Sequence, residues 1–330
     1  MYQAAEMSLW TGRIDTEEPA ELSYRLHQVV QSLSPVNEQQ SDALALIGFC
    51  CDEGVRRNRG RVGARKGPDR LRRALANLPW AADRPLYDAG NVICLGHDLE
   101  QAHLELAERV CHCLSAGQLP FVLGGGHEMA YGSWLGLINH QQSLAQSQSW
   151  VQAELPRIGI INFDAHFDLR LDSEGGSSGT PFYQIAQQCQ ALAIPFNYCC
   201  LGVSKTANTA ALFQRADSLG VSYRRDAEMT LLQLEQTLQQ LQLFIDDCDL
   251  IYLSIDLDVL PASVAPGVSA PAARGVGLEV LEPLIQQITQ SGKLKLADIA
   301  EYNPEFDIDQ QTARVVARLF HLIANGALRR

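Results

Sequence analysis

Runs of apolar residues alternate with segments of helical periodicity from residue 43 to the end of this 330-residue chain. Several of these runs are continuous, as at 158–161 and 250–253. A strand that is apolar on both sides has to be covered on both faces, which is typical of parallel strands flanked by helices. The alternation therefore predicts an α/β fold of three layers, with helices on both sides of a mostly parallel sheet of about eight strands.

The expected elements follow one another with short connections. Strands are predicted at 43–50, 87–94, 119–123, 157–163, 196–203, 221–225, 250–257 and 294–300. Helices are predicted at 68–78, 98–115, 128–139, 181–192, 208–219, 230–245, 278–290 and 312–325. Since no segment has the composition of a linker, we expect residues 41–330 to form a single catalytic domain.

Two segments fall outside this pattern. Residues 1–40 are polar and rich in Gln and Ser, with Trp10 and Tyr24 as candidate anchors. We interpret them as an N-terminal extension packed on the domain. Residues 139–153 are also rich in Gln and Ser and lack apolar periodicity, so they are predicted to be a surface insertion.

Composition excludes several classes of protein. The formal net charge of −12 opposes general affinity for nucleic acid. No run of about 18 apolar residues is present, so no membrane span is expected. The nine cysteines are an odd number, and two adjacent pairs lie within strand-like segments, where neighbouring side chains point to opposite faces. Reduced thiols and a cytoplasmic location are the expectation.

Six residues with metal-binding side chains lie at the carboxyl ends of three of the predicted strands. They are His127, Asp164, His166, Asp168, Asp256 and Asp258. The Asp-x-His-x-Asp and Asp-x-Asp spacings place alternate side chains on one side of a strand, and carboxyl ends of parallel strands are where α/β proteins bind ligands. A single Asp or His at a strand end often only caps a helix or a turn. Four carboxylates with two imidazoles instead predict two divalent cations, with Mn²⁺ favoured over Zn²⁺ by the oxygen-rich ligands.

These motifs, with Gly-Gly-Gly-His-Glu at 124–128, resemble those of the arginase and agmatinase (ureohydrolase) superfamily over about residues 43–325. The resemblance implies an arginase-like fold and hydrolysis of a C–N bond in a linear amidine by a hydroxide that bridges two Mn²⁺ per subunit. One ion is implied to bind His127, Asp164, Asp168 and Asp256, and the other Asp164, His166, Asp256 and Asp258. The resemblance further implies that Asp168 carries a proton, that Glu301 pairs with the cationic amidine, and that the protein is a homo-oligomer.

Other stretches indicate the substrate. Residues 60–65, 260–275 and 300–307 resemble members of the superfamily that cleave N-formimidoyl-L-glutamate to L-glutamate and formamide in histidine degradation. Ser178 stands where arginases and agmatinases have a histidine that assists guanidine hydrolysis. The alternatives are an agmatinase- or guanidinobutyrase-like enzyme that releases urea, and a relative that binds metal without catalysis.

An acidic substrate requires cationic side chains. Nine of the 26 Lys and Arg residues lie between 56 and 73, with no aromatic residue among them, which opposes a nucleic-acid site. The candidates for the substrate carboxylates are Arg57, Arg59, Arg61, Arg65, Arg170 and Arg274, with Ser178 beside them. Arg70, Arg72 and Arg73 fall in the predicted helix 68–78 and are expected on a solvated face.

Overall fold

The computed structural model describes residues 1–34, 41–80, 84–147 and 154–326. Within these ranges, ten strands form one sheet in the order β1-β4-β3-β5-β10-β9-β6-β7-β8, with β2 also paired to β4. Every pairing is parallel except that of β1 with β4. The strands are β1 Tyr2–Gln3, β2 Gln31–Ser32, β3 Leu44–Cys50, β4 Leu86–Ile93, β5 Leu119–Leu123, β6 Ile158–Phe163, β7 Asn197–Val203, β8 Ser222–Arg225, β9 Leu250–Asp256 and β10 Leu294–Ala300.

All eight predicted strands are confirmed within one residue at each end, as β3 to β10. The count of about eight was too low because β1 and β2 were not predicted. Each of these has two residues, which is too short to show an alternating pattern.

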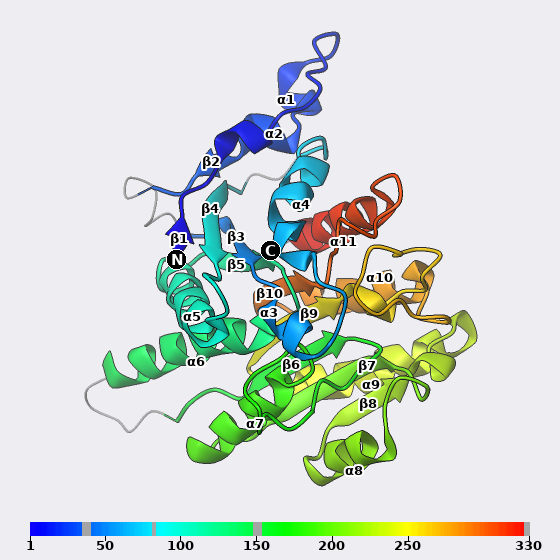
Figure 1. Ribbon diagram of the computed structural model, residues 1–330. Helices are drawn as coiled ribbons and strands as arrows, with labels where there is room; N and C mark the ends of the chain where they lie inside the picture. The colour runs from blue at the N-terminus through cyan, green and yellow to red at the C-terminus, as the bar shows by residue number, and fades with distance from the viewer. Residues whose placement is uncertain (35–40, 81–83, 148–153, 327–330) are drawn as a thin grey trace.

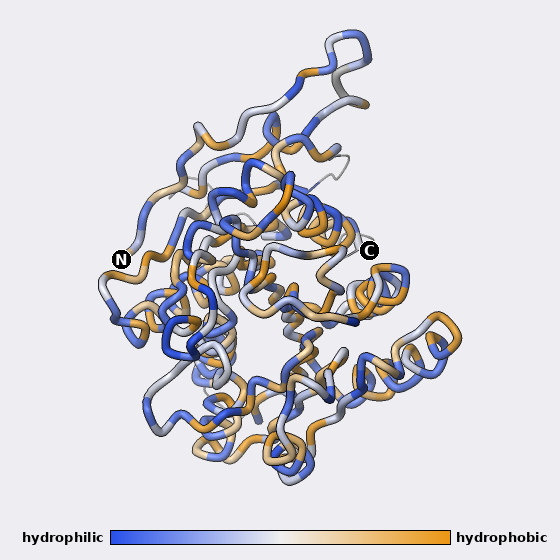
Figure 2. Tube along the Cα trace, turned by 45° about the vertical axis from the view of Figure 1, so that its right-hand side comes forward, coloured by the Kyte–Doolittle hydropathy of each residue, from blue (hydrophilic) through white to orange (hydrophobic). Residues whose placement is uncertain are grey.

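Helices cover both faces of the sheet, which confirms the three-layer architecture (Figure 1). The longer helices are α4 Gly67–Leu75, α5 Leu99–Ser115, α6 Met129–Ser147, α7 Pro181–Ala191, α8 Ala210–Ser218, α9 Leu234–Asp246, α10 Leu278–Gln290 and α11 Gln311–Gly326. Helices α4, α9, α10 and α11 contribute to one apolar core, and α5 to α8 contribute to the other. Hydrophobic and hydrophilic residues alternate along these helices, so each one buries a stripe against the sheet (Figure 2).

The segment 139–153 corrects one prediction. It was expected to be a surface insertion, but α6 continues through it to Ser147, and residues 148–153 lie outside the described residues. Its many polar residues are compatible with a helix, since Gln, Leu and Ala all have good helix propensity and the segment contains no Gly or Pro. The short helix α3, Glu53–Arg57, was likewise expected to be loop.

The N-terminal segment contacts the edge of the sheet through β4. Both β1 and β2 pair with β4, and the Trp10 indole donates a hydrogen bond to the Asp88 carboxylate at 2.8 Å. Arg72 binds the same carboxylate through Nε at 2.7 Å and Nη2 at 2.8 Å. Arg72 is therefore buried, not solvated as expected, because its charge is paired inside the fold. The division at residue 40 stays a prediction.

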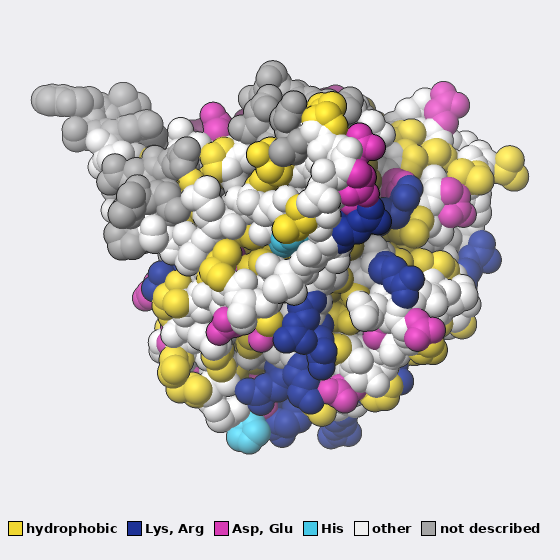
Figure 3. All heavy atoms as spheres, turned by 90° about the horizontal axis from the view of Figure 1, so that it is seen from above, with side chains coloured by type: hydrophobic (Ala, Val, Ile, Leu, Met, Phe, Trp, Pro, Cys, Tyr) yellow, Lys and Arg dark blue, Asp and Glu magenta, His cyan; other side chains and the backbone are white. Residues whose placement is uncertain are grey.

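Positive side chains are unevenly spread over the surface. Figure 3 looks down on the molecule from the side of helices α1, Ala20–Ser23, and α2, Leu26–Val29, and shows Lys and Arg gathered in a band on that face. In a chain of net charge −12, such a band is a local exception. Locally positive surface of this kind attracts small anions.

Candidate metal centre

The candidate site lies at the carboxyl ends of four neighbouring strands, β5, β10, β9 and β6. His127 follows β5, Glu301 follows β10, and Asp256 ends β9. Asp164 follows β6 directly. Since these strands are parallel and adjacent, their ends bring together residues that are up to 174 positions apart in sequence.

Glycines after β5 determine the position of His127. A Cβ atom on Gly125 would lie 2.1 Å from the carbonyl oxygen of Cys51, and one on Gly124 would lie 2.7 Å from that of Ile299. The amide of Gly125 donates to Phe49 O at 2.9 Å, so the turn runs tightly against the end of β3. Only glycine allows this approach, which brings His127 over the sheet.

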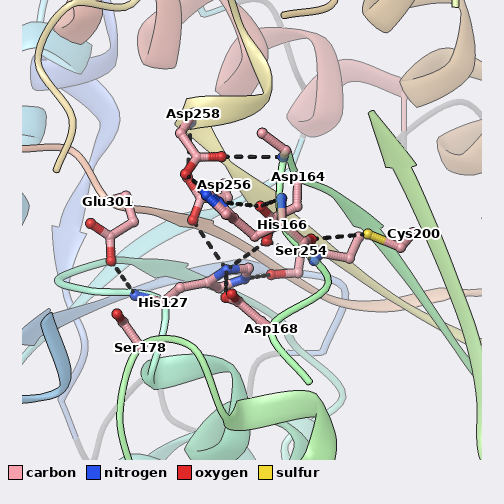
Figure 4. A network of polar contacts seen from close by, with 12 residues as sticks. His127, Asp164, His166, Asp168, Ser178, Cys200, Ser254, Asp256, Asp258 and Glu301 are labelled. Atoms are coloured by element: carbon pink, nitrogen blue, oxygen red, sulfur yellow. Dashed lines mark hydrogen bonds and ion pairs between the residues drawn. The ribbon is translucent and has the colours of Figure 1, made fainter. Parts of the chain in front are cut away.

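The six predicted metal-type residues converge in two groups. One group contains His127, Asp164, Asp168 and Asp256, and the other contains Asp164, His166 and Asp258. In each group the ligand atoms lie within 4.8 Å of one another. Figure 4 shows the His127 imidazole between the aspartates, with Glu301 and Ser178 beside it.

The first group fits a bound divalent cation. Nδ1 of His127 lies 3.1 Å from Asp164 Oδ2, 2.9 Å from Asp168 Oδ2 and 3.1 Å from Asp256 Oδ2. Neighbouring ligands of an octahedral ion at about 2.1 Å lie about 3 Å from one another, so these spacings are those of a coordination sphere. Nδ1 is buried and has no hydrogen-bond partner among the described residues, as expected of an atom that faces a metal.

The second group shares Asp164 with the first. His166 Nδ1 lies 2.9 Å from Asp258 Oδ2 and 3.5 Å from Asp164 Oδ1. Asp164 therefore reaches both groups, which suits a bridging carboxylate. Asp256 belongs to the first group alone, so its predicted role as a second bridge stays a prediction.

A chain of hydrogen bonds behind His127 fixes its ring. Nε2 lies 3.0 Å from Ser254 Oγ, and that hydroxyl donates to Asp298 Oδ1 at 2.6 Å. The hydroxyl of Tyr252 donates to the other oxygen of Asp298. With Nε2–H donating to Ser254, Nδ1 keeps its lone pair for a metal. We did not predict Asp298, although a carboxylate among the apolar residues 296–300 of β10 was a signal that it had a buried partner.

Burial and mutual repulsion shift the acid–base properties of the cluster. Burial, with the neighbouring Asp164 charge, raises the pKa of Asp168 to about 6. Burial and the charges of Asp258 and Asp164 raise the pKa of Asp256 well above its usual range. Burial would lower the pKa of His127, but the carboxylates of Asp164, Asp168 and Asp256 around Nδ1 raise it well above the usual value. Without cations the cluster therefore retains protons, and binding of a divalent ion would release them.

Glu301 lies beside the cluster in an unusual conformation. Its φ is +67°, a left-handed value that few non-glycine residues adopt. Oε1 accepts a hydrogen bond from the His127 amide at 2.9 Å, and Oε2 is buried without a partner among the described residues. Burial raises the pKa of Glu301 to about 7. Oε2 is thus available to a ligand.

A cavity of about 330 Å³ opens over the cluster. Of the predicted site residues, its walls include His127, His166, Asp168, Asp256, Asp258, Glu301, Arg61 and Ser178. Asp164 does not line the cavity and lies fully buried beneath it. Arg59 and Arg170 also line it, and so do Asn58 and Asn208, which we did not predict. An amide side chain carries no sequence signal of its own in a polar loop.

The other predicted arginines lie elsewhere. Arg57 lines an adjoining hollow and is paired with Glu53 at 3.0 Å and Glu100 at 2.6 Å. Arg274 lines a second hollow, of about 630 Å³, which shares the His166 wall with the first cavity. Arg65 is exposed and lines neither. Their contact with a substrate stays a prediction.

The sheet order and the two metal-type groups define a protein of the arginase class. A model of the arginase family matches residues 42–324, and the chain belongs to this family.

Comparison with individual proteins gives more detail than the family model. The chain is 55% identical over 320 residues to formimidoylglutamase of Aeromonas hydrophila, covering 97% of this chain and 98% of that protein. It is 52% identical over 329 residues to formimidoylglutamase of Ralstonia nicotianae, covering 99% and 97%. The crystal structure of Trypanosoma cruzi formiminoglutamase with Mn²⁺ has a TM-score of 0.77 at 25% identity, covering 93% of this chain and 99% of that one.

Helix length and polarity bear on the membrane prediction. Among the described residues, no helix combines the length and apolar character needed to cross a bilayer.

Proposed function

We propose that this protein is a formimidoylglutamase, which hydrolyses N-formimidoyl-L-glutamate to L-glutamate and formamide in histidine degradation. The observation that carries the proposal is the identity of 52–55% to proteins of that name across nearly the whole chain. The six-residue cluster at the base of a cavity large enough for a small amino acid derivative supports the same reaction.

Two Mn²⁺ per subunit suit the donor set. We propose His127, Asp164, Asp168 and Asp256 as ligands of one ion and Asp164, His166, Asp256 and Asp258 as ligands of the other. Such a pair supplies Lewis-acid polarisation and a water molecule deprotonated near neutral pH.

The side chains of this protein bind the amidine and move protons. Glu301 Oε2, buried and unpartnered, pairs with the cationic formimidoyl group and holds its carbon over the cluster. Asp168 lines the cavity beside the proposed metal position, so its carboxylate is placed to accept a proton from the attacking water and to return it. That proton goes to the nitrogen of glutamate as the C–N bond breaks, because an amide anion is too poor a leaving group.

Ser178 favours a formimidoyl substrate over a guanidine. It lies in the cavity wall, where its hydroxyl accepts a hydrogen bond from Asn58 Nδ2 at 3.1 Å. A serine hydroxyl does not gain or lose a charge near neutral pH, unlike the histidine that the guanidine hydrolases of the superfamily have there.

We also propose that the protein acts in the cytoplasm. All nine cysteines are free thiols, and most of them are buried. Such a set suits a reducing compartment. Cell fractionation tests this, and enrichment in a secreted or periplasmic fraction would contradict it. Assembly into a homo-oligomer stays a prediction from the family.

A substrate panel tests the reaction. Purified protein loaded with Mn²⁺ is incubated with N-formimidoyl-L-glutamate, agmatine and 4-guanidinobutyrate, and formamide, glutamate and urea are measured. We expect formamide and glutamate in equal amounts and no urea. Urea from either guanidine with no formamide would indicate the urea-releasing alternative, and no product from any substrate would indicate a metal-binding relative without catalysis.

A further inference from the structure

Of the three arginines that line the cavity, Arg59 and Arg170 have no side-chain hydrogen bond or ion pair among the described residues. We propose that they bind the two carboxylates of the substrate, Arg170 the α-carboxylate and Arg59 the side-chain carboxylate. This assignment rests on the proposed function, because it requires a substrate with two carboxylates beside the reacting amidine. A guanidinium binds a carboxylate through two parallel hydrogen bonds, which fixes orientation as well as charge.

The neighbouring arginines already have partners. Arg61 donates to the carbonyl oxygens of Ser269 at 3.0 Å and Val268 at 2.6 Å, and its guanidinium lies 3.9 Å from the centre of the Phe306 ring. These contacts fasten its loop to the segment after β9. Arg57 is occupied by two glutamates, as described above. Arg59 and Arg170 are therefore the two cations of the cavity wall that remain available for an anion.

Arg170 is held close to the reacting centre. It comes two residues after Asp168, and its amide donates to Gly179 O at 2.8 Å. A Cβ atom on Gly179 would lie 2.8 Å from Arg170 Cδ, so the aliphatic part of the side chain lies flat against that glycine. In the substrate, the α-carboxylate is separated from the reacting nitrogen by a single carbon. We therefore assign the carboxylate nearest the reaction to the arginine that follows the metal-type residue Asp168 by two positions.

Arg59 lines the same cavity with a left-handed backbone conformation. Its φ is +61°, a value at which glycine or asparagine would be more stable. Asp168 and Glu301, which line the same cavity, also have positive φ values, of +49° and +67°. The side-chain carboxylate of glutamate lies two methylene groups farther from the reacting nitrogen. We assign it to Arg59, the other unpartnered guanidinium of the cavity wall.

One hydrogen bond joins the two segments that carry these arginines. Asn58 Nδ2 donates to Ser178 Oγ at 3.1 Å. Asn58 directly precedes Arg59, and Ser178 directly precedes Gly179, whose carbonyl accepts the hydrogen bond from the Arg170 amide. The bond links the loop after α3 to the segment after β6. It holds the two backbone segments that carry the arginines next to each other at the cavity.

The test combines variants with truncated substrates. Arg59→Ala and Arg170→Ala are assayed with N-formimidoyl-L-glutamate, with N-formimidoyl-L-glutamine, which lacks the side-chain charge, and with N-formimidoyl-4-aminobutyrate, which lacks the α-carboxylate. For Arg59→Ala we expect kcat/KM to fall about 10- to 100-fold on the glutamate derivative, mostly through KM, and to stay unchanged on the glutamine derivative. For Arg170→Ala we expect kcat/KM to fall by a similar factor on the glutamate and glutamine derivatives and to stay unchanged on the 4-aminobutyrate derivative.

Two further variants exclude an effect on folding. Arg59→Gly relieves the strained φ, so it is expected to unfold at the same or a higher temperature while losing as much kcat/KM as Arg59→Ala. Arg73→Ala, at an exposed arginine of α4 away from the cavity, is the matched control and is expected to match the wild type. Equal losses on all three substrates, or no loss on the glutamate derivative, would overturn the assignment. A wild type that does not cleave N-formimidoyl-L-glutamate would overturn the proposed function and the assignment together.

Discussion

Four carboxylates and two imidazoles gathered at one end of the sheet determine the chemistry of this protein at the scale of single residues. The sequence predicted this group from the alternation of side chains along a strand. The residues do converge, but 164–168 lie in irregular backbone after β6, and Asp258 lies in a single 3₁₀ turn, Leu257–Val259, after β9. Asp298 and Asn58 could not be predicted in the same way. Each is a single polar residue whose partner, Ser254 or Ser178, is 44 or 120 positions away, and only the folded chain brings them together.

The hydrogen-bond chain behind His127 gives the first prediction. Asp298→Asn keeps the shape of the side chain but can no longer accept two hydrogen bonds as an anion, so Ser254 no longer fixes the His127 ring. We expect the affinity for Mn²⁺ to fall about 10- to 100-fold. Calorimetric titration of metal-free protein with Mn²⁺ measures this directly. Unchanged affinity in a folded variant would show that the chain of hydrogen bonds does not orient the ligand.

At the scale of elements, continuous apolar runs located the strands well, because a buried parallel strand has no polar face to interrupt the run. Helix ends were less predictable. The prediction ended the helix at 139, yet α6 reaches Ser147. Residues beyond 139 still have good helix propensity, although the apolar periodicity that guided the prediction is lost there. The five-residue helix α3 escaped prediction because it is too short to show a period.

His103 on α5 gives a prediction of pH dependence. It is buried, its ring stacks on Phe49 at 6.2 Å between ring centres, and burial lowers its pKa to about 4. The unfolded chain takes up this proton more readily, so the contribution to stability is complete above pH 6.5 and is lost as the pH falls toward 4. Between pH 7.5 and pH 5 we expect His103 alone to reduce the free energy of unfolding by about 2 kcal/mol.

Urea denaturation of wild type and His103→Phe at the two pH values measures this contribution. The variant keeps an aromatic ring against Phe49 but cannot be protonated, so it should lose less stability on acidification. Other acidic groups titrate in both proteins and cancel in the difference. If both proteins lost the same free energy, His103 would not be the group responsible.

At the scale of the whole molecule, the order β5-β10-β9-β6 assembles the site, and the sequence predicted the parallel sheet but not the order of its strands. Strand order depends on the face of the sheet on which each connecting helix packs, and the periodicity of a sequence does not tell which face that is. The attachment of the N-terminal segment to β4 was also beyond the sequence, since it depends on Trp10 reaching the buried Asp88–Arg72 pair.

That attachment gives a prediction for the N-terminal segment. Trp10→Phe removes the hydrogen bond to Asp88 and leaves one buried oxygen of that carboxylate with one donor fewer. We expect a loss of about 1–2 kcal/mol in the free energy of unfolding and faster limited proteolysis within the first 30 residues. Tyr24→Phe, at an exposed residue of the same segment, is the control. Equal cleavage rates in the wild type and Trp10→Phe would mean that this contact does not hold the segment.

The central claim is that this chain is a two-manganese hydrolase of N-formimidoyl-L-glutamate. Its most direct test is to titrate metal-free protein with Mn²⁺ and follow the release of L-glutamate and formamide from N-formimidoyl-L-glutamate at each ratio of metal to subunit. We predict no product without metal, and equal release of the two products that rises to a plateau at two ions per subunit. Product formation that does not depend on Mn²⁺, or no product at saturating metal, would contradict the claim.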